Sequence, residues 1–461
     1  MKFKILIYSF LLIIFSFIAS GSLVKYKIEG GKKFVMLKDI TYFLATIPST
    51  FKQIINNPNI VTNLKNFEHP DKPVPKEDYK NLNTEINKDY KKDLLIVIPR
   101  YNNNIKQSQV DIYDLLSHKI IHTYTHDIES MNKLVDETQY ENENNSINHS
   151  KIRFQYRHPI ILEDGSLISK GEYGPLFKIN ECGLIKWIND TDLFHHSIEF
   201  DNDKNFIWVP SVLRPNSEIV LLNTKGKNIH DDAITKVDIN DGKIVFQKSV
   251  LEILIKNDIL NDRFIFSLTD PIHLNDIEIA RNDSLFWNKG DLFLSLRNLS
   301  SIVQYRPSTD EVINYIKGPF YAQHDIDFIS NSKISIFNNN VKTLKKADDG
   351  LNLFHEDDYL SQVLEYNFVD KKFSKILKKT IKKYSFKNNG ILIDFTPEKD
   401  FLLEDPDSGL LIMGDKNENI NFQLVNKDFN DDIYFFSWSR LIQNLNIVQS
   451  IRKIYNQSNC N

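Results

Sequence analysis

The feature of the sequence that most limits its fold is a unit of roughly sixty residues that recurs six times after Asp93. Each unit holds an alternating strand that ends in an apolar and then a polar residue, a short turn, and a second alternating strand. The apolar residues that end the first strands lie 58 to 68 residues apart; they are Tyr113, Ile179, Val237, Tyr305, Tyr366 and Val425. Repeats of this length without helical periodicity predict an all-β fold, a closed six-bladed β-propeller over residues 91–445. Strand 433–438 is expected to join the first blade and close the ring.

Composition sets wider limits on class and partners. The 461 residues alone would suggest about three domains, but a repeat fold of this size can be one. Hydrophobic residues make up 41% of the chain, which is enough for a large core and excludes a disordered chain. The formal net charge of −4 provides no basic surface for nucleic acid, so none is expected as a partner. A bridge between the two cysteines, Cys182 and Cys460, is possible, but free thiols are expected because Cys460 stands almost at the end of the chain.

The segment before the repeat has a different character. Residues 5–24 carry no charge and are long enough to span the ~30 Å hydrocarbon core of a bilayer, but they also fit a signal peptide. Residues 1–25 are therefore predicted to be a transmembrane anchor or a signal peptide. Residues 26–90 are expected to form a membrane-proximal helical and linker segment, and residues 446–461 a C-terminal tail. The propeller is expected outside the cytoplasm, membrane-anchored and periplasmic, or secreted to the periplasm after cleavage.

Three histidines hold equivalent places in the repeat. His196, His273 and His324 each precede an alternating strand that is followed by a turn and a more apolar strand. In a propeller such a strand is the innermost of its blade, and innermost strands run parallel to one another around the axis. The three imidazoles are therefore expected to meet at one mouth of the channel. Arg297 ends the strand after the one begun by His273, and because neighbouring blade strands are antiparallel it should lie beside His273.

Three histidines and an arginine admit two chemistries. One is a metal site, since three histidines with an open position suit catalytic zinc. The other is nucleophilic group transfer, in which one neutral imidazole attacks and the others act as acid, base or ligand of the developing charge. Arg297 favours the second, because zinc would repel a guanidinium, whereas its planar donors match the oxygens of a sulfuryl or phosphoryl group. We therefore expect no metal and no cofactor.

Other polar residues are expected to be structural. The histidines without a matched placement are taken as surface or packing residues; they are His69, His118, His122, His158 and His195. The carboxylates that alternate with apolar residues on the inner strands are expected to orient those strands or face solvent; they are Glu199, Glu278 and Asp327. Arg100 ends an apolar strand of the first unit and could hold a place equivalent to that of Arg297.

Several short segments resemble the bacterial arylsulfotransferase family. The most specific are 270–275 (DPIHLN), 295–298 (SLRN) and 318–325 (GPFYAQHD), and the segments 195–198 (HHSI) and 437–440 (SWSR) also fit. The resemblance spans roughly residues 93–442. It implies a six-bladed propeller that moves a sulfuryl group from a phenolic sulfate ester to another phenol without a nucleotide sulfate donor.

The resemblance also implies roles for the four candidate residues. His324 would be the histidine that is transiently sulfated, Arg297 and His273 would hold the sulfuryl oxygens, and His196 would assist. The partners would be small phenolic sulfates and phenols, with the membrane contacted only through the N-terminal segment. Two alternatives stay open: a membrane-anchored propeller that binds a ligand without chemistry, and a metal-dependent hydrolase that uses the three histidines.

Overall fold

The computed structural model describes residues 81–135, 151–218, 220, 229–260, 270–340, 342–344, 352–354, 360–386, 390–457 and 460. The predicted anchor or signal segment, and the predicted linker up to residue 80, lie outside the described residues. Within the described ranges, no helix has both the length and the apolar character needed to cross a bilayer.

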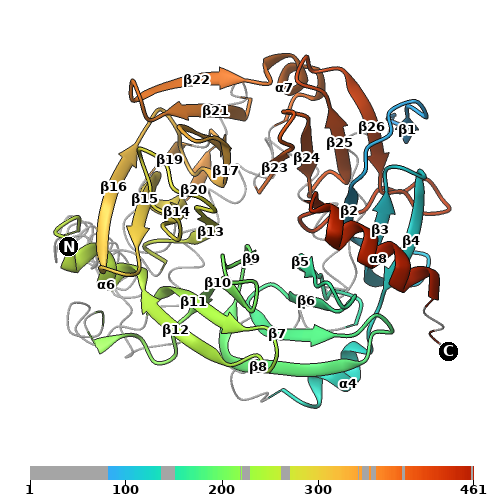
Figure 1. Ribbon diagram of the computed structural model, residues 1–461, viewed down its shortest axis with the longest axis horizontal. Coiled ribbons are helices and arrows are strands. Elements are labelled where there is room, and N and C mark those ends of the chain that lie inside the picture. The colour runs from blue at the N-terminus through green and yellow to red at the C-terminus, as the bar shows by residue number, and fades with distance from the viewer. Residues whose placement is uncertain are drawn as a thin grey trace, which may run out of the picture. The chain divides into compact units, whose positions relative to one another are not determined.

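Antiparallel sheets stand side by side in a ring (Figure 1). The three four-stranded sheets are β27-β2-β3-β4 (Arg440–Ile442, Leu95–Asn102, Gln107–Asp114, Lys119–Tyr124), β13-β14-β15-β16 (Leu274–Ile279, Leu292–Leu296, Ser301–Arg306, Glu311–Lys317) and β17-β18-β21-β22 (His324–Ser330, Lys333–Asn338, Gln362–Asn367, Lys372–Ile376). The five-stranded sheet is β1-β26-β25-β24-β23 (Glu85–Ile86, Ile420–Val425, Leu410–Gly414, Phe401–Asp405, Leu392–Phe395). The outer strands alternate polar and apolar residues, whereas strands such as β14 and β25 are buried on both faces.

The eight-stranded sheet differs from the predicted pattern. Its strands are β5 (Arg157–Ile161), β6 (Leu167–Lys170), β7 (Gly174–Ile179), β8 (Ile185–Phe194), β9 (Glu199–Phe200), β10 (Phe206–Val212), β11 (Asp232–Asp238) and β12 (Ile244–Ser249). The last residues of the long strand β8, Leu193 and Phe194, pair with Val212 and Ser211 of β10 and join two units into one sheet. The prediction of six separate blades therefore needs correction, because only four blade-like sheets are separate in the described part of the chain. A short pair, β19 (Lys342–Leu344) and β20 (Asn352–Phe354), lies apart from these sheets.

The sequence prediction also assigns the marker residue of the last unit to the wrong strand, one strand too late in the chain. Val425 lies on β26, the fourth strand from the centre, whereas the preceding marker residues lie on third strands. The real third strand, β25, is a continuous buried apolar run and so lacks the alternation that marked the other units. Ring closure is made by β27, which pairs with β2, and not by residues 433–438, where Phe436 forms only an isolated bridge with Arg100.

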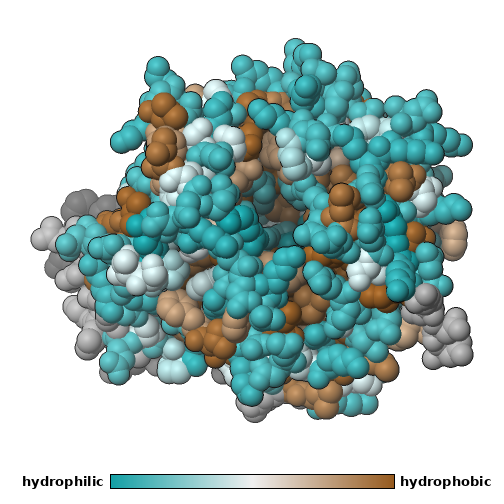
Figure 2. Space-filling model, in the orientation of Figure 1, coloured by the Kyte–Doolittle hydropathy of each residue, from teal (hydrophilic) through white to brown (hydrophobic). Residues whose placement is uncertain are grey.

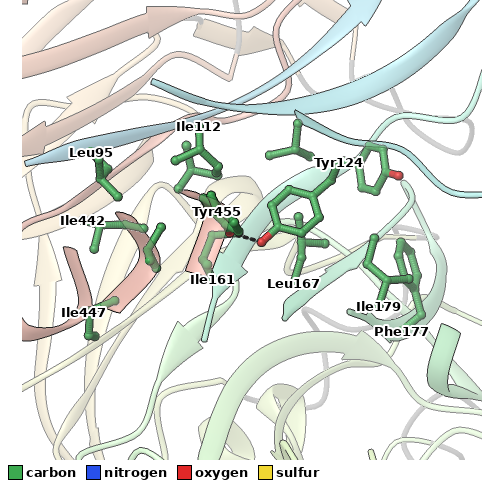
Figure 3. Close-up of a cluster of buried hydrophobic side chains, with 14 of the residues drawn as sticks. Leu95, Ile112, Tyr124, Ile161, Leu167, Phe177, Ile179, Ile442, Ile447 and Tyr455 are labelled. Carbon is green, nitrogen blue, oxygen red and sulfur yellow. Dashed lines mark hydrogen bonds between the residues drawn. The ribbon is translucent and has the colours of Figure 1, made fainter. Parts of the chain in front are cut away.

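The C-terminal segment is a helix, not the expected tail. Helix α8 (Leu445–Gln457) buries Val448 and Ile451 in the cluster between the first two sheets (Figure 3). Tyr455 of this helix contacts the hydroxyl group of Tyr124 on β4. Cys182 and Cys460 form a disulfide that closes a span of 278 residues, so the expectation of free thiols was wrong. The sequence pattern gives no sign of this bridge, because it depends on the packing of α8, which brings Cys460 to the turn after β7.

The remaining short helices occupy connections between strands. They are α4 (Ile128–Asn132), α6 (Val250–Lys256), α7 (Lys378–Tyr384) and a 3-10 turn at Arg297–Leu299. Helix α6 begins at Ser249, whose hydroxyl accepts the backbone N–H of Glu252 in the usual capping arrangement. Polar side chains cover most of the face seen in Figure 2, and apolar residues there are scattered.

Neighbouring inner segments of the ring are tied to one another by side chains that accept a backbone N–H of the next segment along the ring. These five hydrogen bonds are 2.5–3.2 Å long and run from Ile198 to His158, Ile277 to Ser197, Ile326 to Asp276, Ile393 to Asp325 and Leu441 to Asp394. Each satisfies a main-chain donor that no strand pairs with at the centre of the ring. The five bonds fix the spacing of the inner strands that carry the candidate site.

Candidate active site

Each of three histidines at the start of an inner strand has a left-handed backbone. The φ angle is 45° at His158, 55° at His196 and 53° at His273. This region is disfavoured for residues with a β-carbon but is more often adopted by His, Asn and Asp. Asp270 holds His273 in this conformation by accepting its backbone N–H at 3.1 Å. The conformation turns the imidazoles out of the strand pleat, which lets them gather at the centre.

The structure brings the three predicted histidines together. The ring centroid of His196 lies 5.0 Å from that of His273 and 5.8 Å from that of His324. Trp438, at the end of the loop before β27, closes the group, with its ring 4.8 Å from His324 and 5.3 Å from His196. His324 is 4% exposed, so water has little access to its imidazole in this arrangement.

Arg297 lies beside His273, as the antiparallel strand pairing requires. Its backbone N–H donates to the His273 carbonyl at 3.1 Å. The guanidinium makes one side-chain hydrogen bond within the described residues, from Nη1 to Asn298 Oδ1 at 3.0 Å. Most of its donors therefore remain available for an anionic group. Arg100, by contrast, is engaged by Asp111 and Asn426 and has no place in this cluster.

His273 and His324 have opposite electrostatic surroundings. His273 Nδ1 lies 2.6 Å from Asp270 Oδ2. Burial raises the pKa of Asp270, but the hydrogen bond and charge of His273 outweigh it and keep that pKa below its usual value. The pKa of His324 lies well below its ordinary value because the ring is buried and because Arg297, His273 and Arg157 are nearby cations or potential cations. His273 is thus placed to donate a hydrogen bond while the Asp270 carboxylate orients its ring, and the lowered pKa of His324 favours a free lone pair on that ring.

His324 also lacks hydrogen-bond partners. Neither of its ring nitrogens has one within the described residues, and Nδ1 is buried. Its backbone is nevertheless held firmly, because the preceding Gln323 is fully buried and its Nε2 donates to Ser295 Oγ at 3.1 Å and to the Ser301 carbonyl at 2.9 Å. A rigidly placed imidazole without a partner is what a nucleophile requires.

His195 and His158, which the sequence predicts to be surface or packing residues, belong to the cluster. His195 is 1% exposed, and its Nδ1 lies 2.8 Å from Nδ1 of His196. His158 is fully enclosed between Arg440, whose Nη2 lies 2.8 Å from Nε2, and the N–H of Ile198. The available signal was the Arg157–His158 pair at the start of a strand, which matches the position of His195–His196 one unit later in the same sheet.

Sequence reasoning also missed Arg157. Its guanidinium lies 5.6 Å from the Trp438 ring centroid and pairs with Glu172, while its Nε is buried without a partner in the described structure. Burial is the first cause of the low pKa of His196, and Arg157 is among the charges that lower it further. The site therefore has two arginines where the sequence predicted one.

The family of the chain follows from a sequence profile. The profile of the arylsulfotransferase (ASST) family matches residues 158–427, which is more than half of the chain and includes His158, His196, His273, Arg297 and His324. The chain belongs to the arylsulfotransferase family. No curated protein sequence matches it significantly.

Solved structures with a similar fold are distant from this arylsulfotransferase-family chain. A protein of unknown function from Bacteroides caccae is 9% identical, with a TM-score of 0.42, over 76% of this chain and 100% of that one. Virginiamycin B lyase from Staphylococcus aureus is 10% identical, with a TM-score of 0.33, over 62% of this chain and 94% of the lyase. Likenesses this weak carry no argument about activity.

Six acidic residues of this arylsulfotransferase-family chain line a cavity that His158 also borders. This cavity of about 180 Å³ is lined by the carboxylates Glu199, Asp276, Glu278, Asp325, Asp327 and Asp394, together with Arg440. Three of them accept the N–H groups that join neighbouring inner strands, and Glu199 pairs with Arg440 and Arg281. Burial raises the pKa of Asp276 to about 7 and that of Asp394 to about 6. The expectation that Glu199, Glu278 and Asp327 orient strands or face solvent therefore misses the cavity that these three side chains line together.

The alternative of a metal-dependent hydrolase requires side chains that are placed to bind a metal ion. Within the described part of the chain, no three His, Cys, Asp or Glu side chains are arranged to hold a metal ion. The cluster of His196, His273 and His324 also faces the cationic Arg297, which disfavours a bound dication.

Proposed function

We propose that this protein transfers a sulfuryl group from a phenolic sulfate ester to a phenol through a sulfated histidine. The observation that carries the proposal is the imidazole of His324, which is buried and free of hydrogen-bond partners among the described residues, near an arginine with unused donors; burial and that arginine hold the pKa of His324 well below its ordinary value. Membership of the arylsulfotransferase family supports the same chemistry.

In the first half-reaction an imidazole nitrogen of His324 attacks sulfur. The sulfur–oxygen bond to the phenol breaks, and its electron pair leaves with the phenolic oxygen. Arg297 and His273 stabilise charge on the sulfuryl oxygens, and the Asp270 carboxylate keeps the His273 donor oriented. In the second half-reaction a phenol oxygen attacks sulfur, and the nitrogen–sulfur bond breaks with its electron pair returning to His324.

The test uses the purified full chain with p-nitrophenyl sulfate as donor and phenol as acceptor. We expect release of p-nitrophenol that depends on phenol, formation of phenyl sulfate, and ping-pong kinetics in the two substrates. Activity should persist after treatment with a metal chelator. Loss of activity together with one stoichiometric metal ion would favour the hydrolase alternative, and absence of transfer with any aryl sulfate would favour a binding propeller.

We also propose that the ring has six blades. The eight-stranded sheet would then be two blades, β5 to β8 and β9 to β12, fused along the long strand β8. The support is that β5, through His158, and the segment just before β9, through Ser197 and Ile198, both take part in the ring of hydrogen bonds, as the first strands of the other sheets do.

We further propose that the propeller functions outside the cytoplasm. The support is the Cys182–Cys460 disulfide, since such bonds persist in oxidising compartments and are rare in the cytosol. Protease added to intact spheroplasts should degrade the protein. Protection of the chain in intact spheroplasts, with degradation only after lysis, would contradict this location.

A further inference from the structure

A buried row of three side chains leads away from the candidate nucleophile. We propose that Asp232, His195 and His196 form a proton relay that takes the proton from the accepting phenol, stores it, and returns it to the leaving phenol of the next donor. This inference rests on the proposed sulfuryl transfer and names the groups that handle its proton. His196 would contact substrate, and His195 and Asp232 would be positioning residues that act through it.

The contacts of the row are direct. His195 Nδ1 lies 2.8 Å from His196 Nδ1, and His195 Nε2 lies 3.3 Å from Asp232 Oδ1. His195 Nε2 makes no hydrogen bond within the described residues, so Asp232 is the acidic group within reach of it, and the ring must turn to align the two. His195 and Asp232 are each 1% exposed, so water cannot substitute for either link.

The surroundings hold the row in place. Tyr173 stacks on His195, with ring centroids 4.9 Å apart and planes 27° apart. The other oxygen of Asp232 accepts the backbone N–H of Leu274 at 2.7 Å, directly after His273. The carbonyl of His196 accepts a bond from the buried ammonium group of Lys170. Packing and hydrogen bonds thus fix both the relay and the end that faces His324.

The two protonation states follow from the nitrogen atoms that face each other. Only one of the two Nδ1 atoms can carry the proton between them. When Asp232 is ionised, His195 carries its proton on Nε2, His196 donates from Nδ1, and His196 Nε2 presents a bare lone pair to the site. When Asp232 is protonated, both imidazoles shift tautomer and His196 Nε2 presents an N–H group.

The proton balance closes over one catalytic cycle. In the first half-reaction the departing phenolate takes the proton from His196 Nε2, and Asp232 becomes ionised through His195. In the second, the accepting phenol gives its proton to His196 Nε2 as its oxygen bonds to sulfur, and the proton passes to Asp232. One sulfate ester and one phenol are consumed and one of each is formed, with no net proton gained or lost.

Asp232 is able to hold the proton at neutral pH. Burial, and after it the charge of Asp270, raises its pKa to about 7, against the opposing effects of the Leu274 N–H, His273 and His230. Burial likewise keeps the pKa of both His195 and His196 well below the ordinary value, so neither imidazole retains the proton. The stored proton therefore rests on the carboxyl group.

The test compares acceptors that do and do not need a base. The acceptors are phenol, which must lose its proton, and pentafluorophenol, which is already ionised in neutral buffer. In His195→Phe, which keeps a ring against Tyr173 but cannot accept from His196, transfer to phenol should fall ~10²-fold. Transfer to pentafluorophenol, and the initial burst of p-nitrophenolate from p-nitrophenyl sulfate, should change less than about threefold by the same reasoning.

Two further variants separate the relay from simple packing. His195→Asn places a carbonyl oxygen near the former Nδ1 and can still orient His196, but it cannot pass a proton to Asp232, so transfer to phenol should stay as slow as in His195→Phe. Recovery of the wild-type rate in His195→Asn would show that His195 only orients His196 and would overturn the relay. Asp232→Asn should resemble His195→Phe in its preference for ionised acceptors. His118→Asn, a matched change on the turn between β3 and β4, should leave transfer to both acceptors unchanged.

A measurement on the unmodified protein does not depend on how the variants fold. Desulfation by phenol should slow in heavy water, and desulfation by pentafluorophenolate should not. The relay is overturned if His195→Phe slows all acceptors by the same factor, or if neither acceptor shows a solvent isotope effect. Failure of the proposed function would look different, because wild type would then show neither a burst nor transfer.

Discussion

Replacing His324 with asparagine should remove sulfuryl transfer completely. The amide has no lone pair able to form the nitrogen–sulfur bond, so the covalent intermediate cannot form and both half-reactions stop. The expected measurement is loss of phenyl sulfate formation to the background rate. In wild type quenched after the donor is added, an acid-labile mass increment of one sulfuryl group should map to His324.

A matched control is available on the outer part of the ring. His122 lies on β4 and stacks at a centroid distance of 4.1 Å on Tyr455, which belongs to the hydrophobic cluster of helix α8. His122→Asn should keep normal transfer even if it melts at a lower temperature. Near-normal activity of His324→Asn, or a label on His196 or His273, would show that the nucleophile has been assigned wrongly.

The second large effect is expected at Arg297. Arg297→Lys keeps the positive charge, but an ammonium group cannot reproduce two parallel N–H bonds to the sulfuryl oxygens. Losing one preorganised donor of a transition-state charge typically costs ~10²–10³-fold in rate, and we expect a loss of that size in kcat. The residual activity should be measurable, in contrast to that of His324→Asn.

The loss of rate in Arg297→Lys can be compared with the effect of the same substitution at an arginine outside the site. Arg306 lies on β15 and pairs with Asp291, with Nε to Oδ1 at 2.7 Å. Arg306→Lys should change thermal stability at most and leave kcat unaltered. An Arg297→Lys variant that raises only KM would mean that the guanidinium binds the ground state and the transition state equally well.

The sequence predicts the repeat well and the boundaries of the blades poorly. Strands with one face in solvent alternate polar and apolar residues. The sequence therefore indicates the units whose outer strand is of this kind, such as β16. Strand β25 is buried on both faces and gave no such signal, which shifted the last unit by one strand. The fusion along β8 could not be foreseen either, because it depends on two backbone pairs that any residues could make.

The candidate site was predictable to the extent that it follows strand order. His196, His273 and Arg297 take their places from the direction of the inner strands, which the repeat already implies. The repeat gives His195 no matched place in the other units, so the sequence predicts a packing residue there, and adjacent residues on a strand normally point to opposite faces. Because His196 has a left-handed backbone, this alternation of side-chain directions does not hold there. A backbone angle of this kind cannot be read from the sequence.

The hydrogen bonds that join the inner strands make the spacing of the sheets independent of which polar groups line the centre of the ring. Each bond needs a main-chain N–H on one side and any side chain with a reachable acceptor on the other. The chain uses an imidazole at His158, a hydroxyl at Ser197 and a carboxylate at Asp276 for the same purpose. Exchanging one acceptor type for another could therefore change the polarity of the centre while the spacing of the sheets stayed the same. A ring built in this way is open to new reactions through single substitutions at its axis.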